Sequence, residues 1–231
     1  MKKLSVIIID DERNAREEVK KLLEGYPELE IVGEAKNADE AKELIDLKHP
    51  DLLFLDIQMP EKSGFDLLES LDHVPRVIFT TAYDQYAVKA FEVSAIDYLM
   101  KPIREERFAK AMEQVKYKAI TPNDDRIFVK DRQQYHFISW SNVHLIESMD
   151  NYARLYFGDK NVFLKSSLNL LEQKLDKATF FRINRAQIIN LKYIEKMMPA
   201  TEGRLKLLLK TGEEADVSDR QSVKLKKLMK I

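Results

Sequence analysis

Five side chains that bind cations or phosphoryl groups in proteins each stand at the end of a short apolar stretch of this sequence: Asp10, Asp11, Asp56, Thr81 and Lys101. Continuous apolar runs of this length are typical of strands that are buried on both faces of a parallel sheet. The carboxyl ends of parallel strands lie at one edge of the sheet, where open α/β folds bind their ligands. We therefore expect the five side chains to meet at that edge.

Such a group of residues favours phosphoryl chemistry. Three neighbouring carboxylates repel one another and need a counter-charge at neutral pH. Mg²⁺ fits, because it takes one or two carboxylates and completes its shell with water and phosphate oxygens. Lys101 adds a second positive charge, and the Thr81 hydroxyl is a donor for a phosphoryl oxygen. Phosphoryl transfer needs an in-line nucleophile and cations on the equatorial oxygens, so we predict that Asp56 accepts a phosphoryl group.

Each of these residues also has a simpler explanation when it is taken alone. Asp10-Asp11 is equally a signal for the start of a helix. A lysine before a proline is often a solvated loop residue, and a threonine at a strand end often serves as a cap. Only the joint occurrence of these residue types at successive strand ends favours the phosphoryl site.

Strands and helices alternate along residues 1–118. Apolar runs predict strands at 4–9, 30–35, 52–56, 76–81 and 95–100, and helices at 13–24, 40–48, 65–70, 84–92 and 105–118. This alternation predicts an α/β fold, a doubly wound five-stranded parallel sheet.

The second half of the chain has a different texture. The polar, proline-containing segment 119–125 is expected to be a linker. Turn residues then separate short strands, which are expected at 126–130, 135–140, 143–148, 152–157, 162–164, 180–183, 187–191, 204–210 and 213–217. With helices at 168–175 and 218–230, these segments predict a mostly β domain over residues 126–231.

Composition limits the class of protein. The 231 residues include no cysteine, which excludes disulfides and thiolate metal sites and is compatible with a reducing cytosol. No apolar run approaches the ~20 residues of a membrane span, and the first apolar segment is too short for a signal peptide. We expect a cytoplasmic protein that has no membrane partner.

Charge differs between the two halves. Residues 1–118 hold 18 basic and 25 acidic residues, whereas residues 119–231 hold 20 basic and 14 acidic ones. An acidic, ion-binding module joined to a module that meets a polyanion explains this difference, and so does chance drift of surface charge.

The first half resembles the receiver domain of two-component response regulators. The resemblance covers residues 4–118 and rests on motifs in the family's order and spacing: Asp10-Asp11, Asp56 with Met59-Pro60 and Gly64, Thr81-Ala82, and Lys101-Pro102. It implies a flavodoxin-like fold and a sensor histidine kinase that phosphorylates Asp56. It also implies no enzyme activity beyond the domain's own phosphoryl transfer and dephosphorylation.

The same resemblance implies a role for each site residue. Asp11 binds Mg²⁺ directly, Asp10 mainly contacts the metal's water shell, and Gln58 offers its backbone carbonyl. Thr81 and Lys101 bind the phosphoryl oxygens. Tyr98 is the aromatic switch. Gln58 and Tyr83 tune the lifetime of the phosphorylated form. We expect the bulky Tyr83 to shield the phosphoryl group from water.

The second half shows no helix-turn-helix and resembles LytTR-type DNA-binding domains instead. The signature is Phe181-Arg182-Ile183-Asn184-Arg185-Ala186-Gln187-Ile188-Ile189-Asn190. Tyr152 with the upstream Ile146-Glu147-Ser148, and the late Val217-Ser218-x-Arg220, agree with it. Asn184 stands where the family most often has His, and Ala186 where it often has Ser, so the preferred DNA sequence stays open.

In that family, loops between strands enter successive major grooves. The resemblance assigns base contacts to the Asn151-Tyr152 turn, Arg185 and Arg220, whose guanidinium forks read guanine. Asn184 either pairs with adenine or holds the loop, and Arg182 packs or pairs within the domain. Phosphate contacts, with solvated surface charge as the alternative, are expected from Lys192, Lys196 and Lys224.

Together these features predict a transcription regulator that forms a homodimer on phosphorylation, through the face of its fourth helix and fifth strand, and then binds double-stranded DNA. Two alternatives stay open. One is a receiver whose β module binds protein or RNA. The other is a phosphatase with an aspartyl nucleophile, which would need an acid-base carboxylate at position 58, where Gln58 stands.

Overall fold

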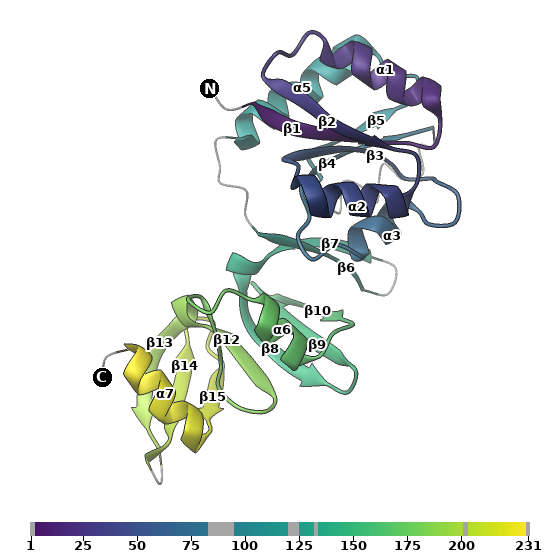
Figure 1. Ribbon diagram of the computed structural model, residues 1–231. Coiled ribbons are helices and arrows are strands. Elements are labelled where there is room, and N and C mark those ends of the chain that lie inside the picture. The colour runs from purple at the N-terminus through teal and green to yellow at the C-terminus, as the bar shows by residue number, and fades with distance from the viewer. Residues whose placement is uncertain (1–2, 83–94, 120–124, 132–133, 201–202, 230–231) are drawn as a thin grey trace. The chain divides into compact units, whose positions relative to one another are not determined.

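The computed structural model describes residues 3–82, 95–119, 125–131, 134–200 and 203–229. The chain divides into two compact units, Met1–Ser139 and Trp140–Ile231. Figure 1 shows the elements of both units. The helix predicted at 84–92 lies outside the described residues.

A five-stranded parallel sheet forms the centre of the first unit, with the strand order β2-β1-β3-β4-β5. Its strands are β1 (Leu4–Ile9), β2 (Leu29–Ala35), β3 (Leu52–Asp56), β4 (Arg76–Thr81) and β5 (Asp97–Met100). Every residue of β3 and β4 is buried. Continuous apolar strands of this kind are expected where helices cover both faces of a sheet. The predicted doubly wound fold is confirmed.

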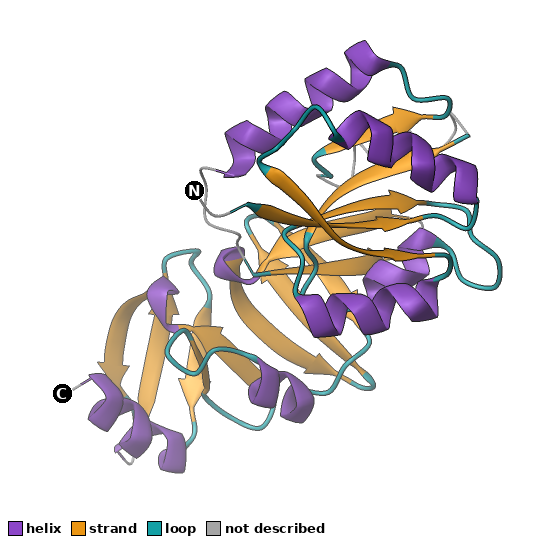
Figure 2. Ribbon diagram, turned by 45° about the horizontal axis from the view of Figure 1, so that its top comes forward, coloured by secondary structure: helices purple, strands orange, loops and turns teal. Residues whose placement is uncertain are grey.

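Helices lie on both faces of this sheet (Figure 1), and Figure 2 shows the same arrangement from a second direction. The helices α1 (Arg13–Leu23) and α5 (Glu105–Ala119) cover one face, and α2 (Ala38–Lys48) and α3 (Gly64–Glu69) cover the other. The α3 helix starts with a capping box, in which Ser63 and Asp66 exchange side-chain and backbone hydrogen bonds.

A hairpin of β6 (Arg126–Asp131) and β7 (Gln134–Ser139) also belongs to the first unit. The Tyr135 ring stacks on Phe65 of α3 at a centroid distance of 4.5 Å, and Phe128 is part of the same core. The boundary of the compact unit therefore differs from the sequence boundary at residue 126. The reason is that the alternating aromatic residues of the hairpin find an apolar surface on α3.

The second unit contains two antiparallel sheets. The larger sheet has the strand order β10-β9-β8-β12-β11. It is built from β8 (Val143–Met149), β9 (Tyr152–Phe157), β10 (Lys160–Leu164), β11 (Phe180–Arg182) and β12 (Gln187–Asn190). The smaller one consists of β13 (Ile194–Pro199), β14 (Leu205–Leu209) and β15 (Glu214–Val217).

The core of this unit lies between the two sheets, where Leu145 and Ile189 of the larger sheet meet Leu207 of the smaller one. The unit also contains α6 (Leu168–Lys174), α7 (Asp219–Met229) and the 3₁₀ turns η1 (Trp140–Asn142) and η2 (Leu191–Tyr193). Trp140 is buried and its ring meets Phe180 edge-on at 6.0 Å. A mostly β second domain is confirmed.

The apolar pattern of the sequence does not predict β13. Glu195 and Lys196 interrupt its apolar pattern, and Pro199 ends it. Within the described sheet, β13 pairs with β14 alone, and edge strands tolerate charged residues and proline because one side of their backbone needs no partner strand. Among the helices that the structure describes, none is long and apolar enough to cross a membrane.

Candidate functional site

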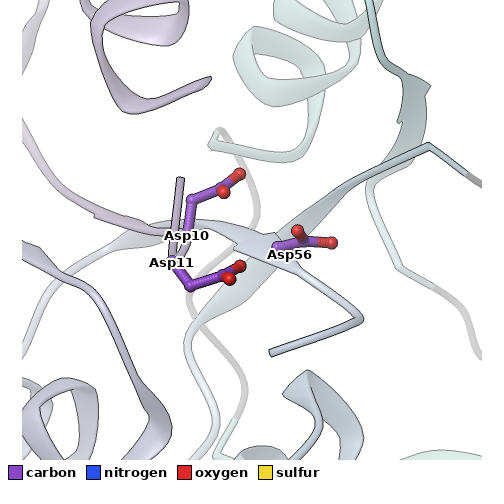
Figure 3. Close-up of side chains that lie close together, drawn as sticks. All are labelled: Asp10, Asp11 and Asp56. Carbon is purple, nitrogen blue, oxygen red and sulfur yellow. The ribbon is translucent and has the colours of Figure 1, made fainter. Parts of the chain in front are cut away.

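The parallel sheet brings the predicted phosphoryl site together. The ends of β1, β3, β4 and β5 are neighbours in the strand order, and Lys101 N donates to the Thr81 carbonyl at 2.8 Å. The carboxylate oxygens of Asp10, Asp11 and Asp56 lie within 4.8 Å of one another. Figure 3 shows Asp10 and Asp11 beside Asp56 at the end of β3.

Lys101 is the cation that Asp10 and Asp56 share. Its Nζ lies 2.7 Å from Asp10 Oδ2 and 2.8 Å from Asp56 Oδ2. Both aspartates are buried, with exposed fractions of 2% and 5%, whereas Asp11 is exposed. The Lys101–Pro102 peptide bond, which follows β5, is cis. The geometry thus holds two carboxylates by one ammonium group and leaves a third open to solvent.

Burial and charge shift the pKa values of these groups in a consistent way. Burial raises the pKa of Asp56 and of Asp10, and the hydrogen bonds and charge of Lys101 offset this only in part. For Lys101, burial lowers the pKa, but the hydrogen bonds and charges of the two aspartates outweigh it and the pKa is raised. One ammonium group therefore offsets only part of the cost of burying these two carboxylates.

The donor set fits Mg²⁺. Three carboxylates offer the hard oxygen ligands that this ion prefers, and the exposed Asp11 leaves room for the waters that it retains. Gln58, whose carbonyl was predicted to be a further ligand, lies two residues after Asp56, and its N–H donates to Asp56 Oδ1 at 3.1 Å. Its side chain is exposed. The donors thus surround a place where a divalent cation would balance the charge.

Gly64 permits the close approach of α3 to β3, the strand that ends at Asp56. Its N–H donates to the Ile57 carbonyl at 2.8 Å. A Cβ atom at this position would lie 2.3 Å from the Asp56 carbonyl oxygen, which is closer than van der Waals contact allows. The glycine that follows Met59-Pro60 therefore has a steric reason, because any larger residue would push α3 away from Asp56.

Arg16 supports the site and was missed by the sequence analysis. Its Nη1 donates to the Asp10 carbonyl at 2.7 Å and to the Asp11 carbonyl at 3.4 Å. Its Nε pairs with Glu34 at 3.3 Å. The available signal was a cation near the start of a helix, which the helix dipole disfavours, so that a specific partner has to be expected.

The residues predicted to act as switch and lifetime groups are only partly described. Tyr98 is buried in the core of the first unit, and its carbonyl accepts a hydrogen bond from Arg107 Nη2 at 3.0 Å. Tyr83 lies outside the described residues. The Thr81 side chain is fully buried at the end of β4. The roles of these residues stay predictions.

In the second unit, three segments predicted to contact DNA lie at one end. Ser148 N, two residues before the β8–β9 turn, donates to the Ala186 carbonyl at 2.8 Å. Ser218 N, directly before α7, donates to the Ile183 carbonyl at 3.0 Å. These bonds join the turn, the loop 183–186 and the start of α7. They bring together Asn151, Tyr152, Asn184, Arg185 and Arg220.

The side chains at this end differ in whether their polar groups are exposed or already bonded within the domain. Asn151, Tyr152, Arg185 and Arg220 are exposed. The Asn184 amide is used within the domain, since its Nδ2 donates to Gln187 Oε1 at 2.9 Å and to the Asp216 carbonyl at 2.8 Å. This favours the interpretation that Asn184 holds the loop over the one in which it reads adenine.

The three predicted phosphate contacts are spread more widely. Lys224 is exposed on α7, one turn after Arg220. Lys192 follows β12, whereas Arg185 precedes it, so the two lie beyond opposite ends of that strand. Lys196 is exposed on the edge strand β13. The structure therefore groups Lys224, but not the other two lysines, with the segments that are predicted to contact bases.

A hydrogen-bonded chain that the sequence analysis missed leads from the loop into the larger sheet. Gln187 Nε2 donates to Glu147 Oε1 at 2.8 Å, and Tyr156 Oη donates to Glu147 Oε2 at 2.5 Å. Burial, and then the hydrogen bond to Glu147, raise the pKa of Tyr156 to about 12. Cross-strand contacts of this kind depend on strand register, which the sequence pattern did not specify.

Comparison with known proteins supports the family resemblance of both halves of the chain. The family model of the response regulator receiver domain matches residues 6–113, and that of the LytTr DNA-binding domain matches residues 133–230. The sensory transduction protein LytT of Bacillus anthracis is 31% identical over 245 residues, which cover 99% of this chain and 100% of that protein. The transcriptional regulatory protein BtsR of Salmonella typhi is 35% identical over 235 residues, which cover 96% and 98%.

Among solved structures, the response regulatory domain of protein mrkE from Klebsiella pneumoniae is 32% identical, covers 49% of this chain and 96% of its own, and has a TM-score of 0.46. The two family matches and the full-length relatives confirm both resemblances found in the sequence. The names of these relatives describe a sensory transduction protein and a transcriptional regulatory protein, so they give no support to the phosphatase alternative.

Proposed function

This chain belongs to the response regulators that join a receiver domain to a LytTR DNA-binding domain, and we propose from this premise that phosphorylation of Asp56 controls its binding to DNA. It regulates transcription within a two-component system. The phosphoryl group comes from a sensor histidine kinase, the phosphorylated chain forms a homodimer, and the dimer binds double-stranded DNA in the cytoplasm.

The observation that carries this proposal is the convergence of Asp10, Asp11 and Lys101 around Asp56. A carboxylate oxygen of Asp56 attacks the phosphorus of a phosphohistidine, an O–P bond forms, and the P–N bond to the histidine breaks. The histidine nitrogen takes up a proton. Lys101 is close enough to Asp56 to bind an oxygen of the arriving phosphoryl group, which stabilises the charge of the transition state.

A bound Mg²⁺ would supply the second positive charge on the phosphoryl oxygens. Asp11 and Asp56 would hold it directly, Asp10 would contact its water shell, and Gln58 would add its backbone carbonyl. The Thr81 hydroxyl then binds a phosphoryl oxygen, and Tyr98 acts as the switch that follows Thr81. Gln58 and Tyr83 tune how long the phosphoryl group survives.

The DNA-binding surface in this proposal is the end of the second unit that carries Asn151, Tyr152, Arg185 and Arg220. Exposed guanidinium groups offer the paired donors that guanine accepts in the major groove. Lys224 binds a neighbouring phosphate, and Lys192 and Lys196 bind phosphates farther along the duplex. Asn184 holds the loop that presents Arg185. These contacts make the binding both sequence-specific and dependent on salt.

The test is phosphoryl transfer from a small donor. The full chain is incubated with radiolabelled acetyl phosphate and Mg²⁺, and the protein-bound label is measured. We expect label on the wild type and none on Asp56→Asn, which has the same shape and no nucleophile. Equal labelling of Asp56→Asn would show that another residue accepts the group. No labelling of the wild type would contradict the proposed chemistry.

A further inference from the structure

The loop 183–186, which connects β11 to β12, carries the exposed Arg185. Arg182, the last residue of β11, donates hydrogen bonds to the backbone of this loop. Its Nε donates to the Asn184 carbonyl at 3.1 Å and its Nη2 donates to the Arg185 carbonyl at 2.8 Å. One guanidinium group therefore fixes two consecutive peptide carbonyls, next to the side chain that is proposed to read a base.

The other side of the same guanidinium is anchored to α6. Its Nη1 donates to Asn169 Oδ1 at 2.5 Å and to Glu172 Oε2 at 3.0 Å. The Arg182 side chain is only 16% exposed. All three of its nitrogens are thus engaged within the domain. A side chain in this position serves the loop and has little surface left for a phosphate.

Asn184 and Ala186 fix the loop from two further directions. Asn184 Oδ1 accepts a hydrogen bond from Ala186 N at 2.8 Å, while the Asn184 Nδ2 bonds described above reach β12 and β15. The Ala186 carbonyl accepts from Ser148 on β8. Hydrogen bonds therefore hold the backbone before and after Arg185, while the Arg185 side chain itself is exposed.

We propose that Arg182 is a positioning residue, which holds Arg185 where it can recognise a DNA base. This proposal rests on the proposed DNA-binding function. It connects α6 to the loop, so that Arg185 is presented in a fixed place before DNA arrives. The loop then loses its conformational entropy when the domain folds and not when it binds DNA. Lysine cannot replace arginine here, because a single ammonium group does not reach two carbonyls and two α6 side chains at once.

The experiment compares variants of the full chain in the presence of beryllofluoride and Mg²⁺. A duplex selected from random DNA and a scrambled duplex are each titrated over a range of salt concentrations. For Arg182→Lys we expect about tenfold weaker binding to the selected duplex, unchanged binding to the scrambled one and an unchanged salt slope. Amide hydrogen exchange of residues 183–186 should become faster in the same variant.

Three further variants calibrate the assay. Arg185→Ala should lose sequence discrimination, as expected of a base contact, and Lys224→Ala should weaken both duplexes and lower the salt slope by about one. Lys177→Gln removes one positive charge from the cavity that Arg182 also lines, and it should leave discrimination unchanged. If Arg182→Lys behaves like Lys224→Ala or like Lys177→Gln, Arg182 is not a positioning residue.

A variant that leaves Arg182 in place covers the case in which Arg182→Lys does not fold. The double change Asn169→Ala, Glu172→Ala removes both acceptors on α6 and keeps the bonds from Arg182 to the loop. We expect it to lose part of the discrimination, and full discrimination in this variant would overturn the proposal. A wild-type protein that selects no sequence from random DNA would contradict the DNA-binding function itself, which is a separate outcome.

Discussion

At the edge of the parallel sheet, one ammonium group serves two buried carboxylates, because Lys101 lies within hydrogen-bonding distance of both Asp10 and Asp56. The third carboxylate, Asp11, has no such burial and faces solvent. This division has a consequence for the order of events. We expect a cation to enter from the side of the exposed Asp11, whereas Lys101 already lies beside the Asp56 oxygen that is proposed to carry the phosphoryl group.

Asp11→Asn should therefore abolish most of the stabilisation by Mg²⁺. For the wild type, Mg²⁺ at about 100 times its Kd is expected to raise the free energy of unfolding by about 2.7 kcal/mol. Without the metal, the variant should be at least as stable as the wild type, because one of three repelling carboxylates is gone. Thermal melts with and without Mg²⁺ measure both effects.

The matched control for this experiment is Asp159→Asn, which removes an exposed carboxylate from the second unit. It should keep the full response to Mg²⁺. An Asp11→Asn variant that responds to Mg²⁺ as strongly as the wild type would place the ion elsewhere.

Among the elements, α3 has a double role because its first two residues face different neighbours. Gly64 lies against the Asp56 carbonyl, where a Cβ would not fit. Phe65 meets Phe79 of β4 edge-on at 5.2 Å and stacks on Tyr135 of β7 at 4.5 Å. The helix thus contacts both the strand that ends at the proposed phosphoacceptor Asp56 and the hairpin that precedes the second unit.

Tyr135→Ala should destabilise the first unit by about 2 kcal/mol, since it removes a half-buried ring that stacks on Phe65. Denaturant unfolding of the full chain, followed by circular dichroism, measures the change. Tyr152→Ala is the control, because its side chain is exposed and its loss should change stability by less than about 0.5 kcal/mol. Equal stability of the two variants would mean that the hairpin does not pack on α3.

How far the sequence predicts this molecule depends on whether a feature is local. The run Leu52–Asp56 identifies β3 because continuous apolar character is enough for a central strand. Residue types at strand ends likewise predict the carboxylate cluster. The edge strand β13 lacks such a pattern, and the hydrogen bonds from Arg16 and Arg182 to nearby carbonyl groups depend on the path that each loop takes in space, which the residue pattern does not specify. The alternating aromatics of the hairpin indicate an apolar face, but not that α3 covers it.

On the scale of the whole molecule, the two halves of the chain differ in charge. Residues 1–118 carry more acidic than basic residues, and residues 119–231 carry more basic than acidic ones. Duplex DNA, with one negative charge per ~1.7 Å, attracts the second half and repels the first. Joining two chains through their first halves would place two basic modules on one duplex, which raises affinity through effective concentration without new contacts.

Beryllofluoride with Mg²⁺, which mimics the phosphoryl group on Asp56, should therefore shift the chain from monomer to dimer. Sedimentation velocity at several protein concentrations measures the shift. Asp56→Asn, which cannot bind the mimic in the same way, should stay monomeric under the same conditions. Unchanged sedimentation of the wild type would remove dimerisation from the proposed function while leaving DNA binding untouched.

Trp140 is the only tryptophan of the chain, and it follows directly on the last residue of the first compact unit. Its ring is shielded from water and touches Phe180 within the second unit. Fluorescence excited at this indole therefore monitors one unit alone, without any attached dye. A change in its emission when a phosphodonor acts on Asp56 would show directly that phosphorylation of the first unit alters the conformation of the second.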